Sequence, residues 1–265
     1  MLLAIDIGNT HTVLGFFEGK QLMAHWRLST SPSRTDDETW GYLQMLVQAA
    51  KLSLASVQGV VVASVVPSGT DAMVQMSERY LHRTPVIVSN AIRLGIAIRY
   101  HDPSAVGADR ICNAVAAFEM FGGPSIVVDF GTATTYDVIA KNGDYLGGAI
   151  APGIATASSE LHRRAARLPR IDLHFPDESI GRDTAASMRS GIMFGAVDAM
   201  EGMIRRISKE LGSRPTVIAT GGFSSLVASR TSKVDHIVPT LVLDGARIIF
   251  ERVTKTHSRV PRKRR

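Results

Sequence analysis

One feature constrains this chain more than any other: an apolar run that ends in an Asp-x-Gly turn occurs once in each half. In the first half, Leu2 to Ile5 precedes Asp6-Ile7-Gly8-Asn9-Thr10. In the second half, Ser125 to Val128 precedes Asp129-Phe130-Gly131-Thr132-Ala133-Thr134-Thr135. Another strand-like run follows each turn, and glycine lets the backbone turn tightly because it has no Cβ. A carboxylate beside threonine hydroxyls and backbone N–H groups suits phosphate held together with a cation.

Either turn alone would be weak support for such a site, because Asp and Gly are common in ordinary hairpins. Two copies in matching settings favour a duplicated domain, with both acidic turns facing one cleft, over two unrelated hairpins. The element pattern repeats as well. The first half predicts strands at 2–7, 12–17, 21–28, 59–66 and 85–88, and helices at 36–51 and 68–81. The second half predicts strands at 125–129, 135–139, 145–150 and 216–219, and helices at 154–167, 184–211 and 239–253.

Between the halves, Leu94 to Tyr100 has an extended pattern, and a helix is predicted over 105–121. We place the domain boundary in this helix, which gives domains at 1–117 and 118–255 and a basic tail at 256–265. The fold class is therefore α/β, with two ribonuclease-H-like domains and an interdomain cleft.

The formal net charge is +6 and the isoelectric point is about 9.7, yet five of the positive charges lie in the last seven residues. Without these five charges the formal net charge is +1, so we do not expect a nucleic-acid-binding fold. The tail itself is best interpreted as a solvated terminus. No apolar run is long enough to span a bilayer and no signal-peptide pattern is present, so we expect no membrane partner and a cytoplasmic location.

Cys112 is the single cysteine, which excludes an intrachain disulfide and fits a reducing compartment. It lies in an apolar helical stretch, so we expect a buried, inert thiol. Motifs of other enzyme classes are absent. The single Gly-Lys pair, Gly19-Lys20, lacks the other residues of a P-loop, and no two glycines are spaced as in a dinucleotide fingerprint. His-Glu-x-x-His and Gly-x-Ser-x-Gly are missing too, which argues against a zinc enzyme or an α/β-hydrolase.

The two acidic turns resemble the phosphate motifs of the acetate kinase, sugar kinase, Hsp70 and actin superfamily, and Ala219 to Phe223 resembles its adenosine motif. Together with Gly107-Ala108-Asp109-Arg110 and Gly181-Arg182-Asp183-Thr184, they resemble type III pantothenate kinase over nearly the whole chain, to about Val253. The resemblance implies ATP-dependent phosphorylation of pantothenate to 4'-phosphopantothenate, the first step of coenzyme A biosynthesis.

The resemblance also implies roles for individual residues. Asp109 would be the general base, a role that competes with its reading as a first-turn helix acid. ATP, bound with Mg²⁺, would contact Thr132 and the eight residues of the acidic turn in the first half: Asp6, Ile7, Gly8, Asn9, Thr10, His11, Thr12 and Val13. Asp129 would hold a monovalent cation, K⁺ or NH₄⁺. The pantothenate site would contain Tyr100, Gly107, Ala108, Asp109, Arg110 and Thr184.

In the resemblance, Thr184 comes from the other subunit, which implies a homodimer with its site at the interface. Plainer interpretations remain open: Thr184 as the N-cap of the long helix, and Tyr100 as a surface aromatic residue. Two alternative functions also remain, another small-molecule kinase of the superfamily and a nucleotide-gated regulatory module. Fold analogy alone cannot choose among these functions.

Overall fold

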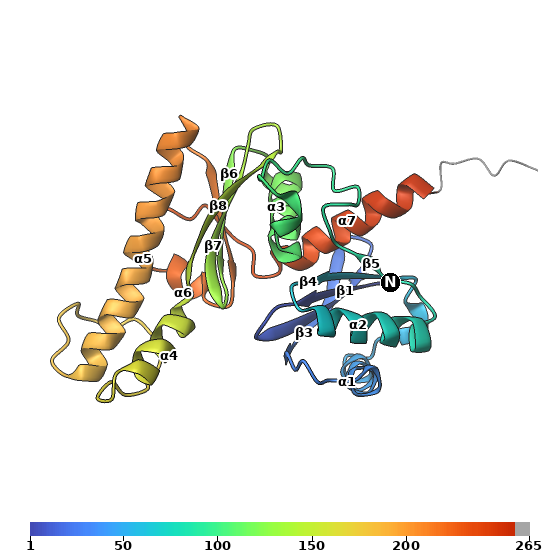
Figure 1. The fold of residues 1–265 in the computed structure, drawn as a ribbon, viewed down its shortest axis with the longest axis horizontal. Helices are drawn as coiled ribbons and strands as arrows, with labels where there is room; N and C mark the ends of the chain where they lie inside the picture. Colours follow the sequence, from blue (N-terminus) through green and yellow to red (C-terminus); the bar gives the residue numbers. More distant parts are fainter. Residues whose placement is uncertain (258–265) are drawn as a thin grey trace, which may run out of the picture. The chain divides into compact units, whose positions relative to one another are not determined.

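The computed structural model describes residues 1–257, with side chains as far as residue 255. These residues form two compact units, and each is described by itself (Figure 1). The first unit comprises Met1–Ala116 and the segment that begins at Leu241, and the second comprises Ala117–Thr240. Within the described part of the chain, no helix is both long and apolar enough to cross a membrane. Most of the predicted basic tail lies outside the described residues.

The first unit is built on a five-stranded sheet with the strand order β3-β2-β1-β4-β5. Strands β1 (Leu2–Ile7), β2 (His11–Glu18) and β3 (Gln21–Ser29) form an antiparallel meander. On the other side of β1, β4 (Gly59–Ser64) and β5 (Val86–Ile87) continue the sheet in parallel. Strand β4 is a nearly continuous buried run, as expected for a central strand that is covered on both faces.

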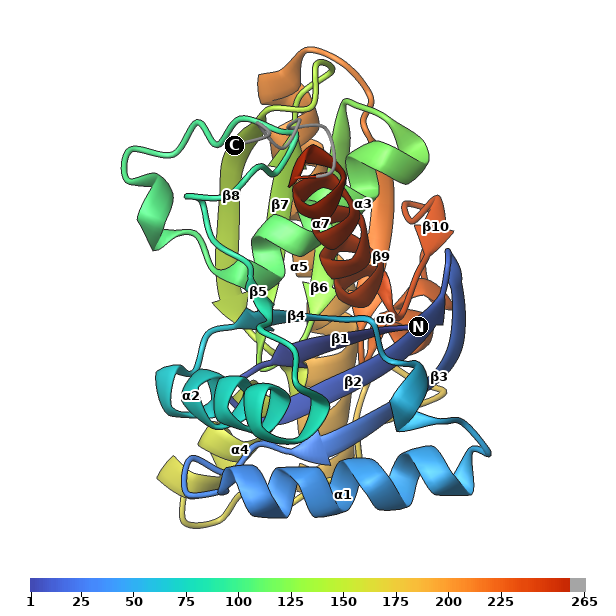
Figure 2. The same ribbon diagram turned by 90° about the vertical axis from the view of Figure 1, so that its right-hand side faces the viewer.

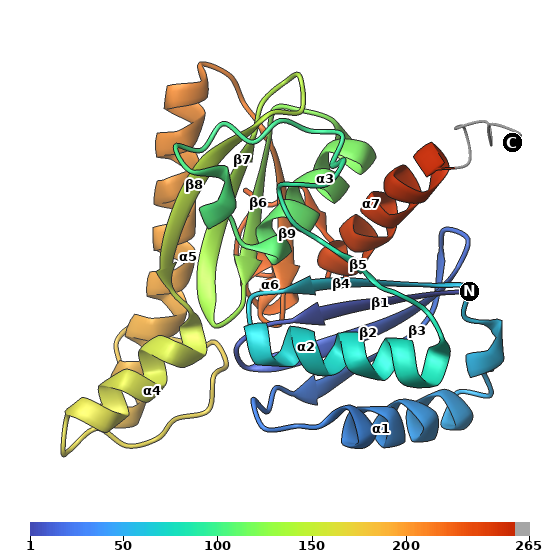
Figure 3. The same ribbon diagram turned by 45° about the vertical axis from the view of Figure 1, so that its right-hand side comes forward.

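Helices cover both faces of this sheet. On one face lie α1 (Asp36–Ala49) and α2 (Pro67–Met76), whose apolar residues form a core with alternate residues of β1. On the other face lies α7 (Leu241–His257), as the views in Figures 2 and 3 show. Because side chains alternate along a strand, Asp6 belongs to the face that α7 covers, opposite the core residues Ile5 and Ile7.

The second unit repeats this plan with the strand order β8-β7-β6-β9-β10. Strands β6 (Ser125–Phe130), β7 (Ala133–Ile139) and β8 (Tyr145–Pro152) form the meander. Strands β9 (Thr216–Gly221) and β10 (His236–Ile237) continue it in parallel on the other side of β6. The same order of pairings in both units confirms the predicted fold class, a duplicated α/β domain of the ribonuclease-H type; the cleft stays a prediction.

One face of the second sheet packs against helices, with Met193, Val197 and Met200 at the centre of the core. These helices are α4 (Ile154–Arg164), α5 (Thr184–Leu211) and the short α6 (Ser224–Ala228). Figure 1 shows α5 running along this sheet. Helix α3 (Ala108–Phe121) contains the point at which the chain passes from the first unit to the second.

The structure corrects several predicted elements. The segment 94–100, expected to be extended, is mostly irregular; the guanidinium of Arg252 in α7 donates to the carbonyl of Leu94, and Gly95 adopts φ +76° beside it. The predicted helix 105–121 begins only at Ala108, after a 3₁₀ turn at Pro103–Ala105. Helix α2 ends at Met76 and passes into a π turn.

The short elements α6 and β10 were not predicted from the sequence. The predicted division counted residues 241–255 with the second half, whereas α7 packs on the strands of the first unit. Phe250 of α7 lies so close to Gly59 of β4 that a Cβ at Gly59 would be 2.2 Å from its ring. Large apolar side chains of α7 thus complete the first unit's core. The domain boundary at 117/118 itself stays a prediction.

Candidate active site

The first acidic turn joins β1 to β2 and is held by three hydrogen bonds. The N–H of Gly8 donates to the carbonyl of His11 at 3.0 Å, which closes the turn. The hydroxyl of Thr30, just after β3, donates to the carbonyl of Gly8 at 2.7 Å, and the N–H of Thr30 donates to the carbonyl of Thr10 at 2.9 Å. The backbone of Gly8 to Thr10 is therefore held by its neighbour strand.

The residues predicted to bind ATP here differ in exposure. Asn9, Thr10 and His11 are exposed, and Asp6, Gly8 and Val13 are partly buried. Ile7 and Thr12 are buried, at 1% and 2% exposure. The side chain of Ile7 packs in the core that α1 and α2 cover, so only its backbone can face a ligand.

Asp109 lies in the first turn of α3. Its Oδ1 atom accepts a hydrogen bond from the N–H of Arg110 at 2.9 Å. A Cβ at Gly107 would be 2.4 Å from the same Oδ1 atom, so the absence of a side chain at Gly107 leaves room for this carboxylate. Arg110 is buried, at 7% exposure, and brings a positive charge to the same helix end.

Asp6 and Asp109 come from distant parts of the sequence but act on one neighbour, Cys112. Burial raises the pKa of the Cys112 thiol well above its usual value, and the negative charges of Asp6 and Asp109 raise it further. The fold of the first unit therefore gathers the acid of the phosphate-type turn and the acid of the Gly107 to Arg110 motif around the start of α3. The thiol is buried and protonated, as predicted for an inert cysteine.

Tyr100 ends the irregular segment that precedes this motif, and 37% of its surface is exposed. The residues between Tyr100 and Gly107 are ordered by Asp102, whose side chain accepts from the hydroxyl of Ser104 at 2.6 Å and from its N–H at 2.9 Å. These two hydrogen bonds lower the pKa of Asp102. A capped 3₁₀ turn thus connects Tyr100 to the start of α3.

In the second unit, Asp129 is the second-last residue of β6 and its carboxylate leans over the end of β9. A Cβ at Gly221 would be 2.4 Å from Asp129 Oδ1, and Gly221 has φ +87°, which favours glycine. The adenosine-like motif and the second acidic turn therefore meet where strands β6 and β9 end.

The second turn is fastened by α4. The carbonyl of Thr132 accepts from the N–H of Gly153 at 3.1 Å and from the hydroxyl of Thr156 at 2.6 Å. A Cβ at Gly153 would be 2.4 Å from the Thr132 carbonyl oxygen, so only glycine allows this approach. The side chain of Thr132 remains exposed.

Behind this turn lies a buried polar group. Asp137 in β7 is fully buried, and it accepts from the hydroxyl of Tyr145 at 2.9 Å and from that of Thr135 at 3.3 Å. A buried carboxylate is costly unless hydrogen bonds compensate for its lost solvation, and these donors do so. Because Thr135 is the cross-strand partner of Asp129, the network braces the strand pair that carries the turn.

Thr184 is the first residue of α5, and it is exposed. The interpretation of Thr184 as the N-cap is wrong, because Asp183 caps the helix by accepting from the N–H of Ala186 at 2.7 Å. Thr184 is therefore not needed for capping.

Sequence reasoning missed the residues that hold the two turns: Thr30, Asp137, Tyr145, Gly153 and Thr156. Only Gly153 carried a signal, since Pro152-Gly153 precedes a helical pattern. The structure brings Asp6, the first turn and Asp109 together in the first unit, and Asp129, Thr132 and Gly221 together in the second.

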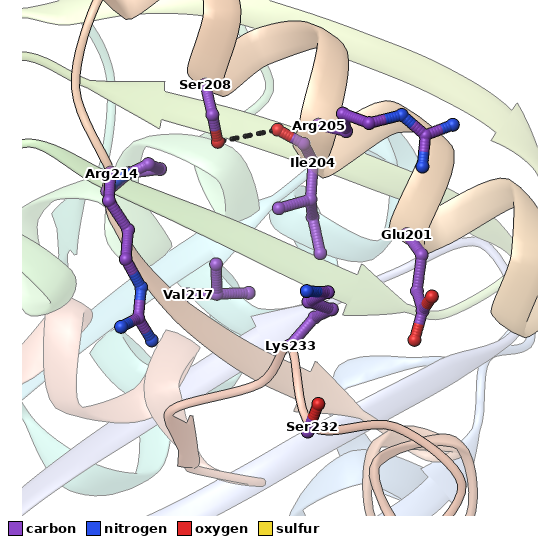
Figure 4. Close-up of a pocket in the computed structure, with 9 residues that line it drawn as sticks. Glu201, Ile204, Arg205, Ser208, Arg214, Val217, Ser232 and Lys233 are labelled. Atoms are coloured by element: carbon purple, nitrogen blue, oxygen red, sulfur yellow. Dashed lines mark hydrogen bonds between the residues drawn. The ribbon is translucent and has the colours of Figure 1, made fainter.

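A cavity of about 560 Å³ lies elsewhere, against the C-terminal half of α5 and the start of β9 (Figure 4). Its wall contains Arg205, Arg214 and Lys233 over an apolar base that includes Ile204 and Val217. Figure 4 shows the guanidinium groups of Arg205 and Arg214 pointing to opposite sides of Lys233, so these cations do not converge. None of the predicted site residues lines this cavity, which we do not assign to the active site.

The resemblance implies that ATP binds together with Mg²⁺, so the residues near the turns must offer the ion suitable ligands. The described residues contain no group of three or more His, Cys, Asp or Glu that could hold a metal. Mg²⁺ bound with ATP usually keeps several waters and needs only one or two carboxylates besides the phosphates. A single carboxylate beside a turn, as Asp6 provides, fits that requirement.

The chain is similar to known proteins over most of its length. The family model described as type III pantothenate kinase matches residues 2–206. The chain is 47% identical over 254 residues to a type III pantothenate kinase of Moorella thermoacetica, which covers 96% of this chain and all of that one. It is 44% identical over 252 residues to one of a Geobacillus species, with 95% and 98% covered.

Among solved structures, component A of (R)-2-hydroxyglutaryl-CoA dehydratase from Acidaminococcus fermentans aligns with a TM-score of 0.58 and 13% identity, over 97% of this chain and 99% of that one. A likeness at such low identity supports the fold alone. The sequence matches decide the family, because they extend over nearly the whole chain and include both turns and the Gly107 to Arg110 motif. The chain belongs to the type III pantothenate kinase family.

Proposed function

We propose that this kinase binds the phosphates of ATP on its two acidic turns and uses Asp109 as the general base toward the terminal hydroxyl of pantothenate. The family assignment makes the chain a phosphotransferase that forms 4'-phosphopantothenate, the first step of coenzyme A biosynthesis. The observation that carries the proposal is the closeness of the two motifs in the first unit: a Cβ at Gly107 would be 3.3 Å from Val65, whose N–H donates to the carbonyl of Ile7, next to Asp6. Phosphoryl transfer needs positioning and charge neutralisation more than covalent help.

The ATP side of the proposal rests on the first turn, from Asp6 to Val13, and on Thr132. Backbone N–H groups and hydroxyls in these segments suit phosphate oxygens. Asp6 would orient hydrated Mg²⁺, which neutralises phosphate charge during transfer. His11 is exposed and contributes to the edge of the turn.

The pantothenate side rests on Tyr100, Thr184 and the segment Gly107 to Arg110. Without a side chain, Gly107 leaves space beside the Asp109 carboxylate. The guanidinium of Arg110 offers a planar fork for an anionic oxygen of the substrate. Asp109 accepts the proton of the attacking hydroxyl, and its hydrogen bond from the Arg110 N–H fixes the carboxylate for that role.

For the cation, we propose that Asp129 binds K⁺ or NH₄⁺. Its carboxylate lies against Gly221 at the end of β9, beside the second turn. An uncompensated carboxylate there would repel phosphate, and a bound cation would reverse that local field.

We further propose a homodimer in which Thr184 of one subunit completes the site of the other. Two features support an interface. Strand β8 is an edge strand, and Ile150 on it is 64% exposed, while Ile180, close to Thr184 in sequence, is 80% exposed. An edge strand presents backbone N–H and C=O groups that can pair with another chain. We place the enzyme in the cytoplasm, which is reducing, and propose no nucleic-acid partner.

The homodimer can be tested by mixing two inactive variants, Asp109→Asn and Thr184→Val, under conditions that exchange subunits. If Thr184 acts in the partner's site, some mixed dimers contain one site with both natural residues, and activity returns. Without such sharing, every site in the mixture lacks one residue and the mixture stays inactive.

The general base is tested by Asp109→Asn, with Asp71→Asn on α2 as a matched, exposed control. Loss of a positioned base costs roughly a hundredfold to ten-thousandfold in kcat. We expect Asp109→Asn to keep its Tm and its affinity for ATP but to lose that much turnover, and Asp71→Asn to behave as wild type. Turnover near the wild-type value in Asp109→Asn would remove Asp109 from the mechanism.

A further inference from the structure

Each of the two acidic turns is held by a threonine that lies outside the turn. In each, a backbone carbonyl of the turn accepts a hydrogen bond from a threonine hydroxyl on another element. Thr30 donates to the carbonyl of Gly8 in the first unit, and Thr156 donates to the carbonyl of Thr132 in the second. The distances are short, 2.7 Å and 2.6 Å. The two units thus fasten corresponding turns by the same chemistry.

In the first unit, the direction of the hydrogen bonds follows from counting hydrogens. Thr30 has one hydroxyl hydrogen, which it gives to the carbonyl of Gly8. Its oxygen lies 3.0 Å from the hydroxyl oxygen of Thr12, so Thr12 must be the donor of that pair. Thr12 is buried and its position is set by β2. The chain from Thr12 through Thr30 to Gly8 therefore fixes the carbonyl against two neighbouring strands.

A fixed carbonyl also fixes the next N–H, because the peptide unit is planar and trans. With the Gly8 carbonyl directed at Thr30, the N–H of Asn9 points the other way. Asn9 lies outside the strands, and its N–H has no backbone acceptor among the described residues. The Asn9 N–H is therefore directed away from Thr30, on an exposed residue of the turn, and can serve as a donor to a phosphate oxygen.

In the second unit, the carbonyl of Thr132 has two donors, Thr156 and the N–H of Gly153. Both belong to the beginning of α4, so the helix end and the turn are joined as one piece. The peptide that follows Thr132 is held in one orientation by this pair of bonds. The exposed side chain of Thr132 is positioned with it.

We propose that Thr30 and Thr156 are positioning residues that hold the two turns in the conformation that binds the phosphates of ATP. This inference rests on the proposed role of the two turns in ATP binding. Each threonine acts through a backbone carbonyl and needs no contact with the nucleotide. Loss of either hydroxyl removes one of the bonds that hold its turn and loosens it, so the cost appears in the affinity for ATP and not in the affinity for pantothenate.

The test compares Thr30→Val and Thr156→Val with Thr30→Ser and Thr156→Ser in the full-length enzyme. Valine keeps the shape of threonine but cannot donate, and serine keeps the hydroxyl. Thr254→Val is the matched control, because Thr254 also donates to a backbone carbonyl, that of Phe250 at 2.9 Å, but in α7. KM for ATP, KM for pantothenate, kcat and Tm are measured for each variant, together with the Kd of ATP.

A hydrogen bond between neutral groups corresponds to about a threefold to tenfold change in an equilibrium constant. We therefore expect each valine variant to raise KM and Kd for ATP about threefold to tenfold. KM for pantothenate should stay within about twofold, the serine variants should recover wild-type values, and Thr254→Val should leave both KM values unchanged. A role in stability alone would instead lower Tm and kcat with both KM values unchanged, and that result would overturn the proposal.

The variant Asp6→Asn separates the positioning role from the role of the turns. If Asp6→Asn weakens ATP binding while Thr30→Val and Thr156→Val do not, the turns bind ATP but the threonines do not position them. If Asp6→Asn and Thr132→Val also leave the Kd of ATP unchanged, the turns have no role in ATP binding, and both proposals are overturned.

Discussion

Gly221→Ala gives the sharpest test of how the second unit holds Asp129. An added Cβ would lie 2.4 Å from Asp129 Oδ1 and 2.7 Å from the backbone N and C atoms of Phe130. The Asp129 carboxylate can rotate away, but the backbone of Phe130 cannot move easily, because Phe130 is buried at 2% exposure in the middle of the sheet. The substitution must therefore displace the carboxylate and strain the strand.

The magnitude follows from two contributions. A left-handed backbone, φ +87° here, costs a residue with a Cβ roughly 1–2 kcal/mol, and forcing an extra carbon into a packed site costs roughly 1–3 kcal/mol. Together they lower the free energy of unfolding by about 2–5 kcal/mol. At about 2–4 °C per kcal/mol for a chain of this size, Tm falls by about 4–20 °C.

The assay is urea unfolding of the wild type, Gly221→Ala and the control Gly195→Ala, combined with activity as a function of K⁺ concentration. Gly195 lies within α5, and an added Cβ there would meet nothing within 4 Å, so alanine should stabilise the helix by roughly 0.5–1 kcal/mol. Gly221→Ala should also weaken the response to K⁺. An unfolding free energy within about 0.5 kcal/mol of wild type, with an unaltered K⁺ response, would refute the reasoning.

Three further predictions concern the cation, the thiol and the tail. Asp129→Ala should remove the dependence of initial rate on K⁺ at saturating Mg²⁺-ATP, with Na⁺ replacing K⁺ at constant ionic strength; an unchanged K⁺ response would contradict this. Because the pKa of Cys112 is raised in the folded chain, the unfolded chain loses its thiol proton first. Unfolding free energy should thus fall as pH rises above about 8.5, with Cys112→Ala removing that part of the slope, and the native thiol should resist alkylation. Deleting residues 259–265, which lie outside the described residues, should leave kcat unchanged.

The sequence predicted the duplicated sheets well, because each meander begins with an apolar run that stops at an acidic turn. The start of α1 at Asp36 was also predicted, and the structure adds a capping box there, formed by Thr35 and Glu38. The long helix α5 was predicted with its observed bounds. These elements depend on residues that are close together in the sequence, so they can be predicted from it directly.

Other features depend on residues that are distant in the chain. The segment 94–100 has an extended pattern, yet Arg252 in α7 holds Leu94 in an irregular loop. The hydroxyls of Thr30 and Thr156 look like ordinary surface polar groups until the fold brings them to Gly8 and Thr132. Patterns among neighbouring residues do not predict contacts between distant residues. The turns of the site were therefore predicted, but the two threonine hydroxyls that hold them were not.

The activity of the enzyme can be measured directly as phosphate transfer from ATP to an acceptor. Purified protein is incubated with ATP, Mg²⁺ and K⁺, with pantothenate, acetate or a hexose as the acceptor, and the products are identified by mass spectrometry. We expect pantothenate to gain one phosphoryl group at its terminal hydroxyl, with ADP formed in equal amount, and acetate and the hexose not to react. Phosphorylation of acetate or the hexose in preference to pantothenate, or ATP turnover that is indifferent to the acceptor, would contradict this expectation.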